Sequence, residues 1–176
     1  ILPKGYKLIV EKNTNIKTNN DGIIIVQGPI EIIGTKDNPV NIYSENGGKG
    51  LIVLNSSEKS HLKFVKFSGL HAPSKISLSI MGAINFYNSP VSIEDSIFEN
   101  IYSEDALNII RSEFKIKNTV FKNVSSDAFD SDFSKGEVLN SKFYNVGNDA
   151  IDVSGSLIKV ISTTINNSGD KAISVG

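Results

Sequence analysis

The chain contains 176 residues, of which 18 are Lys or Arg and 19 are Asp or Glu, so the formal net charge is -1. This balance gives no electrostatic reason to expect nucleic acid or an anionic membrane surface as a partner. The sequence has no cysteine and only two histidines, which excludes disulfides, thiolate metal sites and three-histidine metal sites.

Short β-type runs fill the first half of the chain. Residues 1–20 are expected to form a first, less regular coil. Five strands are predicted after it, at Gly22–Val26, Ile30–Ile33, Val40–Tyr43, Gly50–Leu54 and Leu62–Phe67. Equivalent positions recur at intervals of about 28 to 32 residues. The excess length falls in polar stretches at 43–49 and 70–80, which are expected to form loops.

A repeat of 22 or 23 residues runs through the second half. One position of the unit is alanine, a second is phenylalanine or isoleucine, and a third is asparagine. The three columns are Ala83, Ala106, Ala128, Ala150 and Ala172; Phe98, Phe121, Phe143 and Ile165; and Asn100, Asn123, Asn145 and Asn167. Columns that share one period indicate a repeat architecture.

Each unit holds two short runs with alternating apolar residues, for example Ala128–Ser131 and Val138–Phe143. Alternation with period two is typical of strands with one buried face, and no helical periodicity is present. We therefore predict an all-β fold, a single-stranded parallel β-helix solenoid with coils of about 22 residues. It forms one domain over 1–176, less regular at 1–81 and regular at 82–176.

Stacked coils place like residues over like, which predicts several side-chain columns. Phe67 joins the other phenylalanines in an internal stack, and the asparagines form a hydrogen-bonded ladder at a buried bend. Lys115, Glu137 and Lys159 form an outward column of alternating charge. The alanines share the parity of outward residues, so we expect them either to line a shallow groove that admits a sugar ring or to be covered by a loop of the same chain.

Two kinds of phrase carry a family resemblance. Gly34–Val40 reads Gly-Thr-Lys-Asp-Asn-Pro-Val, and the repeat units contain Asp-Ala-Ile-Asp at Asp149–Asp152 and Phe-x-Asn at Phe143–Asn145. In these phrases the chain resembles the right-handed parallel β-helix superfamily, the pectate-lyase-like proteins of secreted bacterial type. The resemblance implies a right-handed coil, an extracellular or cell-surface location, and a polysaccharide or cell-surface glycan as ligand.

A narrower resemblance concerns the coil starts of polygalacturonases, which read Asn-Thr-Asp-Gly, Gly-Asp-Asp and Gly-His-Gly. The matching stretches are Ser125–Ala128, Gly147–Asp149 and Gly169–Lys171. The match places Asp127 and Asp149 at two aspartate positions of that family. The chain departs from the pattern at Asn148, where the family has aspartate, and at Asp170, where it has histidine. The family's Arg-Ile-Lys motif is not found.

One outward register is rich in carboxylates and amides, at Asn85, Asn108, Asp130, Asp152 and Ser174. Carboxylates one strand spacing apart repel, so one pKa is expected to rise, as glycoside hydrolysis requires. We predict Asp127, Asp149 and Asp152 as catalytic residues and Asn108, Asp130 and Asp132 as substrate-binding residues. A calcium site at Asp130, Asp132 and Asp152 is an alternative; no other cofactor is expected. A solvated stripe whose residues cap turns is the third interpretation.

Three functions follow as hypotheses. The first is an extracellular or cell-surface segment that binds or presents to polysaccharide through the Asp/Asn stripe. The second is a glycoside hydrolase or polysaccharide lyase, which places the aspartates in a cleft beside residues 70–80. The third is a structural stalk or adhesin scaffold with an open acidic face. The lone arginine, Arg111, is expected in an ion pair.

Two further expectations concern the whole chain. No apolar run approaches the ~20 residues that a membrane-spanning helix requires, so we expect no membrane span. The chain begins with Ile1 and stops at Gly176 within a repeat. We therefore expect it to be part of a longer parent chain, with the remainder of that chain as a partner.

Overall fold

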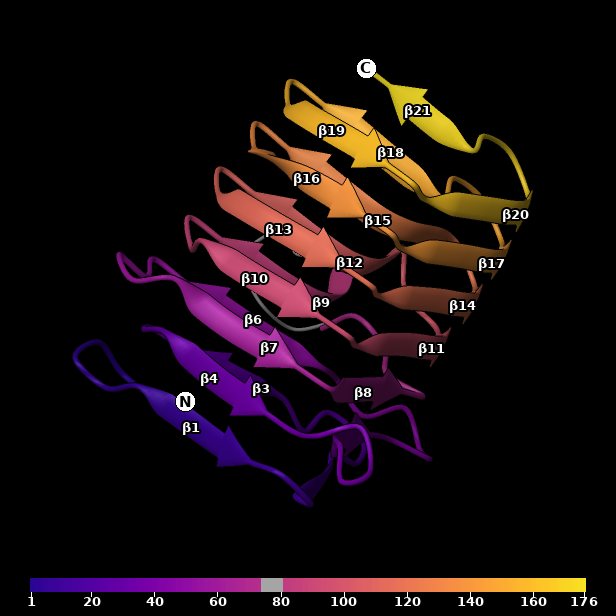
Figure 1. The fold of residues 1–176 in the computed structure, drawn as a ribbon. Helices are drawn as coiled ribbons and strands as arrows, with labels where there is room; N and C mark the ends of the chain where they lie inside the picture. Colours follow the sequence, from indigo (N-terminus) through magenta and orange to yellow (C-terminus); the bar gives the residue numbers. More distant parts are fainter. Residues whose placement is uncertain (74–80) are drawn as a thin grey trace.

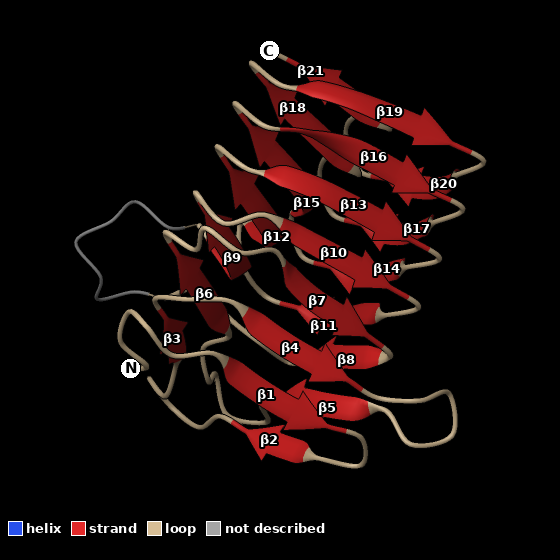
Figure 2. Ribbon diagram, turned by 60° about the vertical axis from the view of Figure 1, so that its left-hand side comes forward, coloured by secondary structure: helices blue, strands red, loops and turns tan. Residues whose placement is uncertain are grey.

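The computed structural model describes residues 1–73 and 81–176, and all regular secondary structure in these ranges is β. Short strands stack in successive coils about one axis (Figures 1 and 2). They form three parallel sheets of seven strands, and consecutive strands always belong to different sheets. The fold is a parallel β-solenoid of about seven coils, which confirms the predicted fold class.

The strands of each sheet are three apart in chain order. The first sheet contains β1 (Leu8–Glu11), β4 (Ile30–Ile33), β7 (Ser60–Lys63), β10 (Val91–Glu94), β13 (Glu113–Lys117), β16 (Lys135–Leu139) and β19 (Leu157–Ile161). The second contains β2 (Asn15–Lys17), β5 (Val40–Tyr43), β8 (Val65–Ser68), β11 (Ile97–Ile101), β14 (Val120–Val124), β17 (Lys142–Val146) and β20 (Thr164–Ser168). The third contains β3 (Ile24–Val26), β6 (Leu51–Leu54), β9 (Gly82–Tyr87), β12 (Asp105–Ile110), β15 (Asp127–Asp132), β18 (Ile151–Ser154) and β21 (Ile173–Val175).

The corners between sheets are formed by single residues in the left-handed backbone region. From the third sheet to the first, these residues are Asn55, Asn88, Arg111, Phe133 and Gly155. From the first sheet to the second, they are Phe64, Asp95, Asn118, Asn140 and Ser162. Glycine and asparagine enter this region readily, whereas other side chains meet steric resistance. Stacking on the adjacent coils therefore has to hold the other residues in place.

These corners correct two predicted strands. The run Leu62–Phe67 is divided between β7 and β8 by Phe64, whose φ is 51°. The run Val138–Phe143 is divided between β16 and β17 by Asn140, whose φ is 48°. Each regular coil consequently has three strands rather than the two predicted. The hydropathy pattern continues through a one-residue corner, so it does not reveal the corner.

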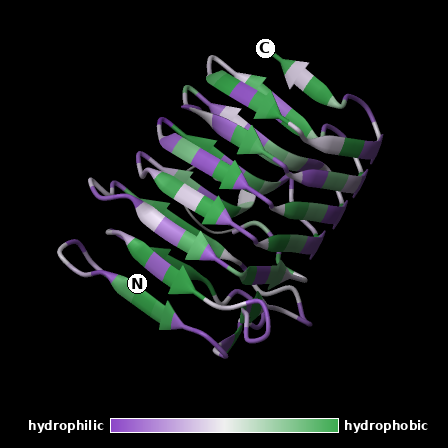
Figure 3. Cartoon of the chain, viewed as in Figure 1, coloured by the Kyte–Doolittle hydropathy of each residue, from purple (hydrophilic) through white to green (hydrophobic). Residues whose placement is uncertain are grey.

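The interior is built from columns of identical or similar side chains, and apolar and polar bands alternate along many strands (Figure 3). Phe67, Phe98, Phe121 and Phe143 are fully buried, with successive ring centroids 4.9, 4.6 and 4.8 Å apart. Ile165 pairs with Phe143 and continues the column. This confirms the predicted phenylalanine stack, and stacked rings at this spacing stabilise the coils beyond their area of burial.

The asparagine ladder is present, but it is exposed rather than buried. The amide nitrogens of Asn123, Asn145 and Asn167 each donate to the side-chain oxygen of the preceding asparagine, at 3.2, 3.2 and 3.0 Å. The ladder residues have left-handed backbone at a bend within the second-sheet strands. Solvent reaches the side chains at this convex bend, which is why the predicted burial was wrong.

Buried hydroxyl groups form a second ladder that the sequence analysis did not find. At the corner after β12, Ser112 Oγ accepts a hydrogen bond from the Ser89 amide at 2.8 Å and donates to the Ile110 carbonyl at 2.8 Å. Ser134 and Ser156 repeat the arrangement one and two coils later. Each hydroxyl therefore satisfies a backbone amide of the neighbouring coil that would otherwise be buried without a partner.

Other predictions about the coils have mixed outcomes. The charged column is confirmed, because Lys115 pairs with Glu137 and Glu137 with Lys159 across the first sheet. Coil length in the first half varies more than predicted, since Leu8 pairs with Ile30, a step of 22, whereas Val53 pairs with Phe86, a step of 33. Over the described ranges, no helix is long and apolar enough to cross a membrane.

Candidate functional site

The predicted Asp/Asn register is confirmed on the third sheet. Asn85, Asn108, Asp130, Asp152 and Ser174 are successive neighbours across β9, β12, β15, β18 and β21. Asn85 and Asn108 are only 2% and 4% exposed, however, whereas Asp130 and Asp152 are half-buried. Solvent thus reaches this register only from β15 onward, so the interpretation as a solvated stripe applies to that part of it and not to Asn85 and Asn108.

Asn108 links two of the carboxyl groups. Its Nδ2 donates to Asp105 Oδ2 at 3.0 Å and to Asp130 Oδ2 at 2.7 Å. Asp105 lies at the start of β12 and is 3% exposed. The Oδ1 atom of Asn108 is buried and has no hydrogen-bond partner among the described residues. One buried amide therefore holds two carboxyl groups from neighbouring coils in fixed positions.

Burial raises the pKa of Asp130 in this register and of two carboxyl groups beside it, Asp105 and Asp132. The pKa of Asp130 rises to about 8, first through burial and then through the charges of Asp105, Asp132 and Asp152. The pKa of Asp105 rises to about 7, mainly through burial, with the hydrogen bond from Asn108 acting in the opposite direction. Asp132 also has a raised pKa, through burial and the charge of Asp152. The direction of these pKa shifts agrees with the predicted rise. Asp130 is mostly protonated at neutral pH, whereas Asp105 is close to the midpoint of its titration.

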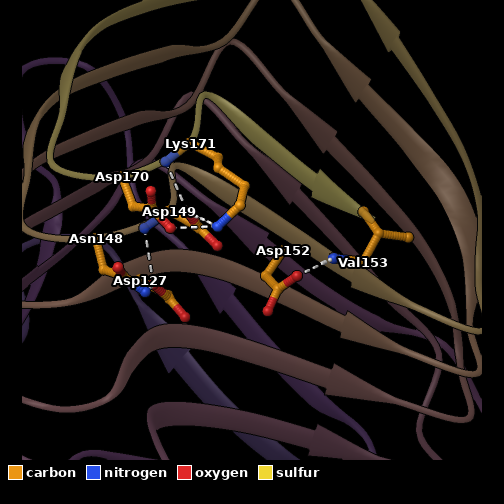
Figure 4. A network of polar contacts seen from close by, with 7 residues as sticks. All are labelled: Asp127, Asn148, Asp149, Asp152, Val153, Asp170 and Lys171. Carbon is orange, nitrogen blue, oxygen red and sulfur yellow. Dashed lines mark hydrogen bonds and ion pairs between the residues drawn. The ribbon is translucent and has the colours of Figure 1, made fainter. Parts of the chain in front are cut away.

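Asp127 and Asp149 bind the backbone of the following coil (Figure 4). Asp127 Oδ1 accepts hydrogen bonds from Asn148 Nδ2 at 2.7 Å and from the Asp149 amide at 2.8 Å. Asp149 Oδ1 accepts one from the Lys171 amide at 2.7 Å, and the Lys171 ammonium lies 3.9 Å away. Both carboxyl groups therefore hold turns in position, which is the role that the turn-capping interpretation gives them.

Asp152 lies apart from this pair in Figure 4, and its neighbour on the adjacent strand is Asp130. Its Oδ1 accepts a hydrogen bond from the Val153 amide at 2.9 Å. The three predicted catalytic residues thus divide into two turn-binding carboxyl groups, Asp127 and Asp149, and one member of the outward row. Their catalytic roles stay predictions. The predicted substrate-binding residues, Asn108, Asp130 and Asp132, lie in the outward part of β12 and β15.

The alanine column does not form the predicted groove. Ala83, Ala106, Ala128 and Ala150 are fully buried and belong to the hydrophobic core. Ala172 is exposed. Parity relates the alanines to the outward aspartates, yet the side chains of these four alanines are buried, as the alternative of a covered column expects. Alternation alone does not show whether an outward position is covered.

Sequence reasoning missed an exposed aromatic pair beside the start of β12. The rings of His71 and Tyr102 stack with centroids 5.3 Å apart, and Tyr102 is 54% exposed. The two residues are separated by the same interval as Phe67 and Phe98, so the period of the interior stack could have revealed them. Burial and the Lys49 charge lower the pKa of His71, which favours a neutral ring.

Other candidates are resolved only in part. Arg111 donates to the Tyr87 hydroxyl at 3.0 Å, and the predicted ion pair does not appear among the described interactions. Among residues 1–73 and 81–176, no three His, Cys, Asp or Glu side chains are gathered as a metal ion requires, so the calcium site stays a prediction. Residues 74–80 of the loop that was expected to border a catalytic cleft lie outside the described residues.

Comparison with known proteins adds no family assignment. No protein-family model matches the chain, and no curated protein matches it. The parallel β-solenoid is therefore established by the structure alone, and the pectate-lyase-like resemblance stays an inference from sequence phrases. Function has to be argued from the site itself.

Proposed function

We propose that this solenoid binds polysaccharide through the row formed by Asp130, Asp132 and Asp152, as part of an extracellular or cell-surface protein. The observation that carries the proposal is a group of three half-buried carboxyl groups on two adjacent coils. Asp130 and Asp152 are neighbours in one register, and Asp132 lies two residues after Asp130 on β15. Adjacent parallel strands lie about 4.8 Å apart, so Asp130 and Asp152 are one strand spacing apart along the solenoid axis. A linear polymer with repeating hydroxyl groups presents partners in the same manner.

The protonation state of the row supports this ligand class. A protonated carboxyl group both donates and accepts hydrogen bonds, as a sugar hydroxyl group does. The raised pKa of Asp130 keeps its carboxyl group protonated at neutral pH, which reduces repulsion within the row. Asn108 Nδ2 donates a hydrogen bond to Asp130 Oδ2 at 2.7 Å, which holds the carboxyl group of Asp130 in position. The row therefore offers directed hydrogen bonds without the reorganisation that a mobile side chain requires.

The test measures binding of the chain to a panel of neutral and uronic-acid polysaccharides by affinity electrophoresis, with and without calcium. Asp132→Ala is expected to weaken retention at least tenfold, because Asp132 is a partly exposed member of the row. Glu137→Gln removes a carboxylate from the first sheet and is the matched control, expected to bind like the wild type. The proposal fails if no polysaccharide retards the wild-type chain, or if both variants weaken retention equally.

Glycoside hydrolysis is a second candidate, favoured specifically by Asp130. A carboxyl group with a pKa of about 8 is protonated at neutral pH and suits a general acid. Asp152 is its neighbour on the next strand, and retaining glycosidases use two nearby carboxyl groups, one as acid and one as nucleophile. Asp130 would protonate the glycosidic oxygen while the Asp152 carboxylate attacks the anomeric carbon. New reducing ends that disappear in Asp130→Asn but persist in Glu137→Gln would support hydrolysis; no reducing ends with any glycan that the chain binds would exclude it.

A further inference from the structure

A column of turn residues runs along the edge where the second sheet passes to the third. Bridges align Lys49 with His71 and His71 with Tyr102. The residues before Tyr102, Ser125 and Gly147 are paired across β11, β14 and β17, and this register places those three residues in line. The column therefore changes along the axis from two aromatic rings to a serine and then to a glycine.

Within residues 1–73 and 81–176, one face of the Tyr102 ring stacks on no other aromatic residue. The other face stacks on His71, 5.3 Å away at an interplanar angle of 29°. The adjacent coil on the other side places Ser125 at the equivalent position, and Ser125 is exposed. Inside the solenoid, by contrast, ring stacks on ring from Phe67 through Phe143. Tyr102 is the last ring of its column and is 54% exposed.

Acidic and amide groups lie along the same edge of the solenoid as this ring. Glu104 is exposed two residues after Tyr102, and Asp127, Asn148 and Asp170 belong to the corresponding turns of later coils. Lys171, on the last of these turns, forms ion pairs with Asp149 and Asp170. Lys49 is aligned with His71 in the same column, and its charge acts on that ring. Charges of both signs therefore lie along this edge, which gives no electrostatic preference for a charged ligand. An apolar ring face beside hydrogen-bonding groups suits a ligand with one apolar face and polar edges.

We propose that Tyr102 is the stacking platform of a sugar subsite that takes an uncharged pyranose ring, with its polar edge toward Ser125 and Asn148. The apolar C–H face of the sugar packs on the open ring face, and His71 supports the ring from behind. This inference rests on the proposed function and narrows its ligand class to neutral glycans. At about 3.3 Å per residue, the six positions from Tyr102 to Asn108 span at most roughly 20 Å, so one glycan chain reaches both the subsite and the carboxylate row.

The test compares substitutions at two exposed tyrosines. Tyr102→Ala is expected to weaken binding of the preferred neutral glycan at least tenfold, whereas Tyr102→Phe retains it, because the ring face carries the contact. Tyr6 is 60% exposed on the first coil, and Tyr6→Ala is the matched control with unchanged affinity. The chain has no tryptophan, so Tyr102→Trp introduces a single fluorescent reporter, whose emission is expected to change when neutral glycan is added.

The outcomes separate this inference from the proposed function. If Tyr102→Ala binds like the wild type while Asp132→Ala does not, the platform is wrong and the carboxylate row stands. Stronger binding of uronic-acid polymers than of neutral ones overturns the assigned ligand class. If Tyr102→Ala fails to fold, unchanged emission of Tyr102→Trp at saturating glycan overturns the platform by itself. A wild-type chain that retains no glycan overturns both proposals.

Discussion

Replacing Asp105 by asparagine is expected to stabilise the solenoid, by an amount that grows with pH. Asp105 is 3% exposed, and its carboxyl group accepts a hydrogen bond from Asn108. Within the described residues it has no cationic partner, and Asp127, Glu104 and Asp132 add negative charge around it. Asparagine has nearly the same shape and keeps an oxygen that accepts from Asn108, so the substitution removes mainly the ionisable group.

The magnitude follows from the shift in the pKa of Asp105, from 3.8 to about 7. At about 1.4 kcal/mol per unit, a shift of this size corresponds to about 4 kcal/mol. Because the pKa is higher in the folded chain, the folded chain binds the proton more tightly than the unfolded chain. The free energy of unfolding therefore falls as pH rises from about 4 to about 7 and is constant above that range. The Asp105→Asn variant has no carboxyl group at this position, so its free energy of unfolding does not fall for this reason as pH rises.

Urea denaturation followed by circular dichroism at pH 5, 6, 7 and 8 measures the effect. The difference in free energy of unfolding between Asp105→Asn and the wild type is expected to increase between pH 5 and pH 7 and then to level off. Glu137→Gln removes an exposed carboxylate from the first sheet and should show no such increase. A constant difference across the pH range, or a variant that is less stable at pH 8, would show that the burial argument is wrong.

Substitutions at three other positions test the stacking of coils. Phe121→Ala removes the middle of the interior ring column and should lower the free energy of unfolding by about 3–5 kcal/mol; a loss under 1 kcal/mol in urea denaturation would contradict a packed stack. Asn123→Ala should cost about 1 kcal/mol, through its left-handed backbone (φ 54°) and two ladder bonds, and Asn123→Gly should cost less; the reverse order in melting temperature would contradict this. Gly147→Ala places a Cβ 2.1 Å from the Ser125 carbonyl oxygen, so we expect a sharp fall in melting temperature, and an unchanged one would refute the close approach.

The coil architecture could be predicted from the sequence because its interior columns repeat residue types. Phe98, Phe121 and Phe143 show the period directly, and their neighbours confirm it. The number of strands per coil could not be predicted in the same way. Phe64 and Phe133 occupy left-handed corners, although phenylalanine is not typical of that conformation. Contacts with neighbouring coils, which no local pattern reports, hold them there.

The candidate site was predictable in its register but not in its environment. The spacing of Asp130 and Asp152 correctly placed them side by side. Asp127 and Asp149 have the same repeat interval, yet their carboxyl groups turn to backbone amides of the next coil. Asp127 has the opposite parity to Asp130 along β15 and is buried. Likewise, Ala128 has outward parity and is nevertheless buried, which alternation along the strand does not reveal.

The hydroxyl ladder has a consequence for how such a chain can change in length. The bonds from Ser89 to Ser112, from Ser112 to Ser134 and from Ser134 to Ser156 all join the same position in neighbouring coils. Deleting or duplicating one whole unit of 22 residues therefore rejoins the ladder with every bond intact. A gain or loss of a few residues shifts the serines out of line. Selection on such a protein is thus expected to favour changes by entire units, which alter its reach without altering its cross-section.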